Sequence, residues 1–251
     1  MVSEEGHLSM FKKYLLLISV LFFGLSAEAK QKRIGLFYPV GEKNEKYLFK
    51  QVSEIDIKDE LNRNTFSEIF DADGVVLLRE TASVVNGQIK NQIMDVFQIN
   101  ERYQLDVVDG RAQFKTFDIT DIKNPKLKSE NKVKINDLFF TGPSLELFIK
   151  KNIADLKNKT KKFEFGIFEL EKSITFDLGP TKKIFKDAGN LVSLKLEVNS
   201  FLFSLFADPL FLEVDPETAA MKRYRGRTPV RIMKNKKLVP FDGDIYYEIT
   251  N

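Results

Sequence analysis

The chain has 251 residues, with 39 Lys or Arg and 36 Asp or Glu, which gives a net charge of +3 at pH 7. It has no cysteine, and its one histidine is His7. Without cysteine, the chain can form no disulfide and has no cysteine nucleophile. Because the one histidine is His7, the rest of the chain also lacks the residues for histidine-dependent triads and for the usual zinc, haem and iron–sulfur sites. The small net charge also weighs against a nucleic-acid partner.

The first 29 residues have the layout of a secretory signal peptide. A short basic region, Met10–Lys13, precedes the apolar run Leu15–Leu25, and Ser26–Ala29 supplies the small residues for cleavage after Ala29. A transmembrane helix needs about 20 apolar residues, so an uncleaved anchor is the weaker alternative. The residues before Met10 are interpreted as an upstream, misassigned start. We predict export to a bacterial periplasm, one domain over residues 30–251, and no transmembrane segment after cleavage.

The first half of the exported chain has the pattern of β-strands joined by tight turns. Asn86-Gly87 and Asp109-Gly110 each separate two apolar runs, and such dipeptides are strong hairpin signals. We predict an antiparallel meander of about six strands, followed by a polar, lysine-rich loop over Asp121–Lys134. The six predicted strands are Tyr47–Ile57, Thr65–Phe70, Val75–Val85, Ile89–Phe97, Tyr103–Val108 and Arg111–Ile119.

A helix is predicted to begin near Pro143, because proline is well tolerated in the first helical turn. Its apolar residues recur at helical spacing and form one face, while lysines lie on the other face or past the end. A basic amphipathic helix also suits a membrane surface, but packing against a sheet is the simpler interpretation. The apolar face consists of Leu145, Phe148, Ile149, Ile153 and Leu156.

The second half returns to strands. Apolar and polar residues alternate from Val192 to Asn199, and this period of two indicates one buried and one wet face. Further strands are predicted at 174–178, 210–214, 219–228 and 245–249. The predicted fold class is therefore mainly β: an antiparallel, strongly bent sheet or partial barrel with one amphipathic helix packed against it.

Arg223, Arg225 and Arg227 form the strongest candidate ligand-binding group. In an extended strand they point to one side, about 7 Å apart in steps of two, and repel one another unless a negative group lies across them. That group is either a ligand phosphate or carboxylate, which the guanidinium fork suits, or a set of neighbouring acids. Pro229 is expected to end the strand or to place it at a sheet edge. The candidate acids are Glu213, Asp242, Asp244 and Glu248.

The segment 200–206 breaks the strand alternation with five apolar residues in seven. Phe201, Phe203 and Phe206 are interpreted either as ordinary core or as the wall of a cavity for an acyl chain. Because they lie close in sequence to the arginines, apolar and cationic surfaces are expected to adjoin. Such a site fits a lipid or another amphiphile with an anionic head.

Other motifs have simpler explanations than a reaction site. Ser129 and Lys132 match a Ser-x-x-Lys pattern, but they lie in a polar segment that would not desolvate the lysine. Asp71 and Asp73 have the spacing of a calcium loop without its later acids, so a hairpin turn is favoured. We therefore predict no catalytic residue, no metal site and no cofactor, and a protein that is not an enzyme.

The stretch from about Leu191 to Arg227 resembles an uncharacterised family of exported, β-rich bacterial proteins of unknown function. Such families are distantly similar to the lipoprotein-carrier half-barrels of the periplasm, which hold lipid chains on a curved sheet. The resemblance implies a periplasmic binding module for a hydrophobic or amphiphilic envelope ligand. The alternative is a non-catalytic structural or partner-binding envelope protein. The resemblance rests on the strand Val192–Val198, Pro209, the turn Asp215–Thr218, Arg223-Tyr224 and Gly226-Arg227.

Overall fold

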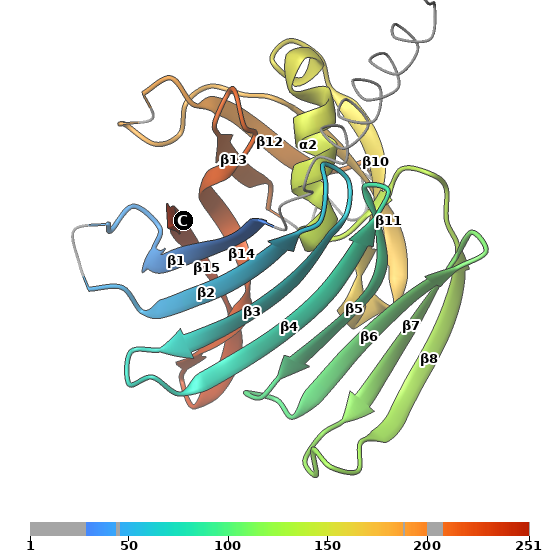
Figure 1. Ribbon diagram of the computed structural model, residues 1–251. Helices are drawn as coiled ribbons and strands as arrows, with labels where there is room; N and C mark the ends of the chain where they lie inside the picture. The colour runs from blue at the N-terminus through green and yellow to red at the C-terminus, as the bar shows by residue number, and fades with distance from the viewer. Residues whose placement is uncertain (1–28, 44–45, 188, 200–207, 251) are drawn as a thin grey trace, which may run out of the picture.

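The computed structural model describes residues 29–43, 46–187, 189–199 and 208–250. Over these residues, fifteen strands form one strongly curved sheet, and the helix α2 (Gly142–Leu156) contacts strands from both of its halves (Figure 1). A short 3-10 helix, η1 (Phe168–Leu170), follows. The prediction of a mainly β, bent sheet with one helix against it is confirmed.

The strands fall into two groups along the chain, one on each side of α2. Those before the helix are β1 (Ala29–Pro39), β2 (Phe49–Ile57), β3 (Arg63–Asp71), β4 (Val76–Val85), β5 (Gln88–Val96), β6 (Glu101–Val108), β7 (Arg111–Asp118), β8 (Lys126–Lys134) and β9 (Phe139–Phe140). Those after it are β10 (Lys161–Ile167), β11 (Lys172–Pro180), β12 (Val192–Val198), β13 (Leu210–Val214), β14 (Met221–Lys234) and β15 (Lys237–Thr250).

Two meanders join at the middle of the sheet. The strand order is β8-β7-β6-β5-β4-β3-β2-β1-β15-β14-β13-β12-β11-β10-β9. Neighbours are antiparallel except for β9 and β10, which are parallel. The joint is made by β1 and β15, where Lys32 pairs with Thr250 and Pro39 with Gly243. The first and the last described strands therefore lie side by side (Figure 1).

The predicted hairpin turns are confirmed. Asn86 and Gly87 have φ values of 53° and 77°, and Asp109 and Gly110 have 50° and 68°. Two successive positive φ angles define the type I′ turn, whose twist matches that of the flanking strands. These turns connect β4 to β5 and β6 to β7.

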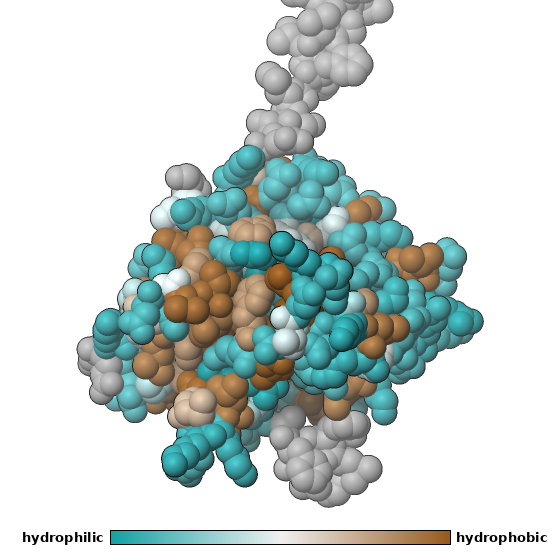
Figure 2. All heavy atoms as spheres, turned by 90° about the horizontal axis from the view of Figure 1, so that it is seen from below, coloured by the Kyte–Doolittle hydropathy of each residue, from teal (hydrophilic) through white to brown (hydrophobic). Residues whose placement is uncertain are grey.

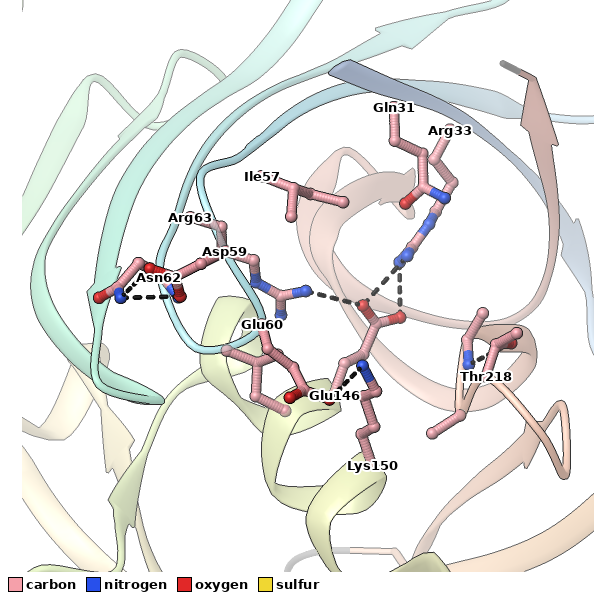
Figure 3. Close-up of a pocket in the computed structure, with 13 residues that line it drawn as sticks. Gln31, Arg33, Ile57, Asp59, Glu60, Asn62, Arg63, Glu146, Lys150 and Thr218 are labelled. Atoms are coloured by element: carbon pink, nitrogen blue, oxygen red, sulfur yellow. Dashed lines mark hydrogen bonds and ion pairs between the residues drawn. The ribbon is translucent and has the colours of Figure 1, made fainter. Parts of the chain in front are cut away.

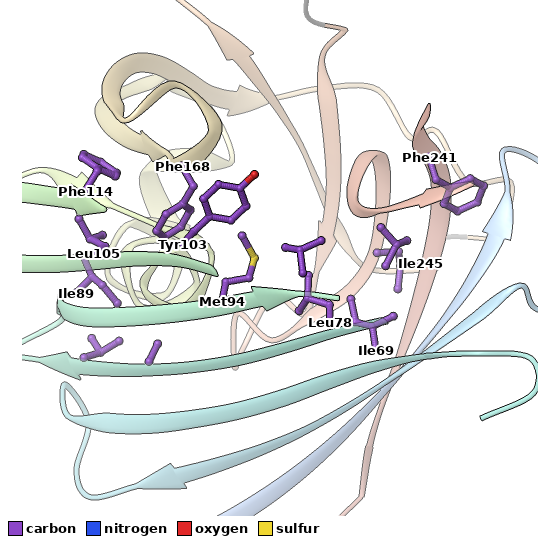
Figure 4. Packing of buried hydrophobic residues seen from close by; sticks show 14 of the residues in the cluster. Ile69, Leu78, Ile89, Met94, Tyr103, Leu105, Phe114, Phe168, Phe241 and Ile245 are labelled. Carbon is purple, nitrogen blue, oxygen red and sulfur yellow. The ribbon is translucent and has the colours of Figure 1, made fainter. Parts of the chain in front are cut away.

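Two hydrophobic clusters fill the concave side of the sheet. The first unites β2 to β7 with Phe168 of η1 and with Phe241 and Ile245 of β15 (Figure 4). The second packs Phe148, Ile149 and other α2 residues against β10 to β13. Burying one large apolar side chain contributes roughly 1.5–3 kcal/mol, so these clusters stabilise the curved sheet.

The prediction of a loop over Asp121–Lys134 is wrong, because β8 occupies most of it. β8 hydrogen-bonds to β7 on one side and keeps its lysines exposed, so its composition resembles that of a loop. Its other side is tied by side chains instead of a strand. Ser129 donates to the Glu171 carboxylate, and Asn131 donates to the Glu171 carbonyl at 2.9 Å.

The expectation that Pro229 ends its strand is wrong, whereas the alternative of a local sheet edge fits, because pairing with β13 reaches only to Arg225. β14 pairs with both β13 and β15 around Arg223 and Arg225, and it runs on to Lys234. Pro229 lies where the register with β15 shifts, between Arg227 and Arg231. A bulge tolerates proline, because no ladder hydrogen bond is required of its nitrogen there.

Candidate functional site

A pocket of about 180 Å³ opens beside α2 at the end of the sheet that carries the β2–β3 turn (Figure 3). β1, β3, α2 and the segment Thr218–Ala220 each contribute to its wall. Its charged inner residues are Arg33, Arg63 and Glu146. The predicted turn at Asp215–Thr218 therefore adjoins a pocket, although its own carboxylate, Asp215, is occupied by the amides of Glu217 and Thr218.

Glu146 is the centre of this site. Arg33 donates to both of its carboxylate oxygens, at 2.7 and 3.0 Å. The backbone N–H of Met221 donates to the same carboxylate at 3.2 Å. The nearest nitrogen of Arg63 lies 3.6 Å from it (Figure 3). One carboxylate therefore lies between two guanidinium groups, both mostly buried.

Arg63 is the less well compensated of the two arginines. Its side chain is 11% exposed, and it donates one hydrogen bond to the carbonyl of Pro143. Among the described residues, the Nε atoms of both Arg63 and Arg33 are buried without a hydrogen-bond partner. A buried donor without a partner is costly, so Arg63 presents unused hydrogen-bonding capacity next to the pocket.

The pKa shifts reflect the same imbalance. Burial acts to raise the pKa of Glu146, but the charge and hydrogen bonds of Arg33 outweigh it and hold that pKa below its usual value. Burial acts to lower the pKa of Arg33, yet Glu146 raises it overall. Burial and the repulsion of Arg33 lower the pKa of Arg63 despite Glu146. Glu146 thus neutralises Arg33, and Arg63 stays a charged group in excess.

The rim of the pocket carries Lys150, Asp59 and Glu60, a net charge of −1 at exposed positions. Lys150 pairs with the exposed Glu60 at 3.2 Å. Asp59 accepts hydrogen bonds from the backbone of Leu61 and Asn62, which closes the β2–β3 turn. Water and salt screen charges at such exposed positions far more than charges in the interior. The six charged residues that line the pocket sum to zero, and the positive excess is confined to the inner group Arg33, Arg63 and Glu146.

A row of polar residues leads from the pocket across the sheet. Arg33 of β1 pairs with Ser53 of β2, Ser53 with Ser67 of β3, and Ser67 with Glu80 of β4. The Ser67 hydroxyl donates to that of Ser53 at 2.8 Å, and Gln92 donates to Glu80 at 2.5 Å. Burial raises the pKa of Glu80, which lacks a cationic partner among the described residues.

The predicted arginine group lies elsewhere, on the outer face of the sheet. Arg225 forms a bidentate pair with Asp244 at 2.6 and 2.7 Å, and Arg227 pairs with Asp242 at 2.6 Å. Arg223 lies 2.9 Å from Asp187 and 3.5 Å from Glu213. Each arginine has a carboxylate partner, as the neighbouring-acid interpretation expected. Of the four acids proposed for that role, Glu248 makes no ion pair within the described part of the chain.

The aromatic part of the predicted site stays a prediction. Phe201, Phe203 and Phe206 lie outside the described residues. Two rings do lie against the arginines: the Phe185 centroid is 4.8 Å from the Arg225 guanidinium, and the Tyr246 centroid is 5.6 Å from that of Arg223. In this geometry, acids of the same chain neutralise the charge of the outer arginines. Binding of an anionic ligand by these arginines stays a prediction.

The inner site combines residues that are distant in sequence, which is why sequence reasoning missed it. Arg33 and Glu146 are separated by 113 positions. Chemically, the site offers guanidinium donors for a carboxylate or phosphate group. Across the part of the chain that the structure describes, no three His, Cys, Asp or Glu side chains gather as a metal site. Within those same residues, no helix is both long and apolar enough to cross a membrane.

Comparisons with known proteins leave the site unassigned. A scan against models of protein families finds no match to this chain, and a search of curated proteins finds none either. A crystal structure of a β-barrel-like protein from Brucella abortus, with the domain of unknown function DUF1849, is similar in outline. The two chains are 6% identical with a TM-score of 0.40, over 88% of this chain and 94% of that one.

Proposed function

We propose that this protein is a non-catalytic binding protein of the bacterial envelope, whose inner pocket takes the anionic group of a small or amphiphilic ligand. The observation that carries the proposal is the sharing of one carboxylate, Glu146, by two buried guanidinium groups. A ligand carboxylate or phosphate beside Arg63 would supply the missing negative charge and accept its unused hydrogen bonds.

The size of the pocket limits the ligand. At about 180 Å³ it is smaller than the roughly 300–1,000 Å³ of typical ligand pockets. It therefore suits a small anion or one head group, with any apolar part of the ligand outside it. The proposed resemblance to periplasmic lipoprotein carriers, and the predicted export, are the reasons for including amphiphiles.

A binding role fits the chemistry of the site better than a catalytic one. A general base works best when its pKa lies near the working pH. Arg33 instead holds the pKa of Glu146 below its usual value, which makes this carboxylate a weak base at neutral pH. The exported chain also has no histidine or cysteine to replace it.

The test is a ligand search followed by matched substitutions. The exported protein is examined by native mass spectrometry and extraction, and then titrated calorimetrically with phosphate, short carboxylates and the anionic amphiphiles recovered. Arg63→Gln is expected to weaken binding at least tenfold, because the excess charge is removed. Arg227→Gln is the control, since its charge already has Asp242 as a partner.

Two results would contradict the proposal. One is equal weakening by both substitutions, which would place the anion elsewhere. The other is the absence of any co-purified or titrated anionic ligand. In that case the alternative of a structural or partner-binding envelope protein would take its place, and crosslinking in the native envelope would be the next measurement.

A further inference from the structure

The end of the sheet opposite the pocket carries two projecting segments. The first is 118–128, the turn from β7 to β8, and the second is 231–238, the tip of the β14–β15 hairpin. Strand pairing fixes their place. Near the pocket, Arg33 of β1 pairs with Ile249, whereas at the far end of β1, Pro39 pairs with Gly243. The hairpin tip therefore extends past the end of β1, away from the pocket.

The two segments are held close together by the turn between β5 and β6. Gln98 in this turn donates to the carbonyl of Arg231 at 2.7 Å and accepts from its N–H at 2.9 Å. Glu101, just after it, accepts a hydrogen bond from Lys128 of β8. Although burial opposes it, Lys128 and Tyr103, with the charge of Arg231 nearby, lower the pKa of Glu101. Lys128 pairs with this carboxylate, and Gln98 of the same turn holds Arg231.

These segments combine exposed aliphatic side chains with an excess of positive charge. Met233 is 66% exposed and Leu127 is 55% exposed, and Ile122 and Leu238 are also exposed. Together the segments hold seven Lys or Arg and two Asp, a net charge of +5, against +3 for the entire chain. We call them the basic-apolar end. Figure 2 views the molecule from this side and shows hydrophobic residues gathered on the left and centre of the face, interspersed with hydrophilic residues.

The order of residues in the basic-apolar end differs from that in an ordinary solvent-exposed turn. Each of its four exposed aliphatic residues has a lysine next to it in the sequence: Ile122-Lys123, Lys126-Leu127-Lys128, Met233-Lys234 and Lys237-Leu238. Exposed aliphatic residues at the pocket end have Asn or Asp as neighbours instead, as in Leu61-Asn62, Val108-Asp109 and Asp137-Leu138. Single exposed apolar residues are common on proteins, and Val40, Leu48 and Val75 at the same end have no lysine neighbour. Over the described chain, the exposed apolar residues that do have one all lie in these two segments.

We propose that the basic-apolar end docks onto an anionic lipid bilayer. Lysines attract anionic head groups, and adjacent aliphatic side chains enter the boundary between head groups and acyl chains. The long lysine side chains keep their ammonium groups at the water side while their stems lie in the boundary. A protein partner is disfavoured, because lysine is depleted at protein–protein interfaces. The pocket then faces away from the membrane, and this inference does not depend on what the pocket binds.

The test uses vesicles and the chain from Ala29 onward, because all fifteen strands and both hydrophobic clusters lie within residues 29–250. Vesicles of phosphatidylcholine alone are compared with vesicles that contain phosphatidylglycerol, by co-sedimentation at low and high salt. Preferential binding to the anionic vesicles is expected. The paired substitution Met233→Ser with Leu127→Ser should weaken it at least tenfold, and salt should weaken it further.

The natural chain has no tryptophan, so one introduced indole reports on a chosen position. Met233→Trp is expected to shift its fluorescence to the blue on anionic vesicles, while Val108→Trp at the pocket end should not. The control for the paired substitution is Leu61→Ser with Val108→Ser, which removes two exposed apolar side chains, 45% and 53% exposed, from the other end and should leave binding unchanged.

Three outcomes would overturn the inference. They are no preference for anionic vesicles, an equal loss in the control pair, and vesicle binding without a fluorescence shift at position 233. Binding to a soluble polyanion as tight as to vesicles would also overturn it, since that would indicate charge attraction alone. The pocket variant Arg63→Gln should bind vesicles like the natural chain, so a failure here is distinguishable from a failure of the proposed function.

Discussion

The two arginine groups of this molecule balance their charge in opposite ways. On the outer face, Arg225 and Arg227 each have a carboxylate of their own on the neighbouring strand. In the inner pocket, Arg33 and Arg63 share Glu146. The outer group is the denser in sequence, and it is the one whose charge the chain itself neutralises.

This difference separates two meanings of a cationic cluster. A row of arginines at alternate strand positions attracts notice in a sequence, yet antiparallel pairing brings acids directly opposite it, as Arg225 opposite Asp244 and Arg227 opposite Asp242. A ligand site needs charge that the fold leaves in excess. The pocket meets that criterion with fewer arginines.

The largest effect is expected from Glu146→Gln. The substitution keeps the shape of the side chain but leaves two buried guanidinium groups without a carboxylate, and breaking a buried pair costs about 3–5 kcal/mol. Urea unfolding at pH 7 measures the loss. A cost below about 1 kcal/mol would contradict the claim that the inner charges are desolvated. Partial recovery of the free energy of unfolding in phosphate buffer, but not in chloride of equal ionic strength, would indicate that an anion can replace the lost carboxylate.

Asp244→Asn is expected to have the next largest effect, a loss of about 2–3 kcal/mol in the free energy of unfolding. Its carboxylate is 0% exposed and holds both Arg225 and the backbone N–H of Gly41. Phosphate should give no recovery, because the excess charge at Arg225 faces a packed surface with Phe185 over it. Recovery equal to that of Glu146→Gln would erase the distinction between the two groups.

Two buried glutamates should respond to pH with opposite signs. The raised pKa of Glu80 means that the folded state binds its proton more tightly, so stability falls as the pH rises above the unfolded value of about 4.3. Glu80→Gln should therefore gain stability over the natural chain between pH 5 and 7. For Glu146, whose pKa is lowered, stability is present above about pH 4.3 and is lost below it.

Unfolding curves of the natural chain, Glu80→Gln and Glu146→Gln at several pH values measure this contrast. The advantage of Glu80→Gln should grow with pH, and the penalty of Glu146→Gln should shrink in acid. Parallel curves for all three proteins would show that neither carboxyl titrates differently in the folded state.

The smallest effect is expected from Asp242→Asn. Arg227 is 54% exposed and Asp242 is 46% exposed, and exposed pairs contribute about 0–1 kcal/mol. The substitution should move the urea midpoint only slightly and leave the m-value unchanged. A loss of stability as large as that of Asp244→Asn would mean that the exposure of an ion pair on this face does not predict how much the pair stabilises the fold.

Local patterns were sufficient to predict most of the fold. The period of two, the two type I′ turns and the proline at the start of α2 are short-range signals, and the strands they predict are present. β8 was missed because an edge strand keeps lysines on exposed positions. β10 was missed because Lys161 and Lys162 at its start resemble the charged end of the preceding helix.

The pocket was beyond prediction for a different reason. Its parts come from β1, β3 and α2, and no local spacing relates Arg33, Arg63 and Glu146. One signal was present, since Glu146 directly follows Leu145 of the helix's apolar face. A single charge beside an apolar stripe has several explanations, however, and only the strand order decides which side chains meet it.

The position of β1 beside β15 also has a consequence for how the molecule is made. Because Lys32 pairs with Thr250, the sheet cannot be completed until residues 237–250 have been synthesised. Before then, β1 and β14 each lack the strand that separates them, and unpaired edges invite association with other chains. Contacts this distant in sequence also slow folding. The order of synthesis therefore leaves an open sheet, for which protection by a chaperone would have the greatest value just before its last strand arrives.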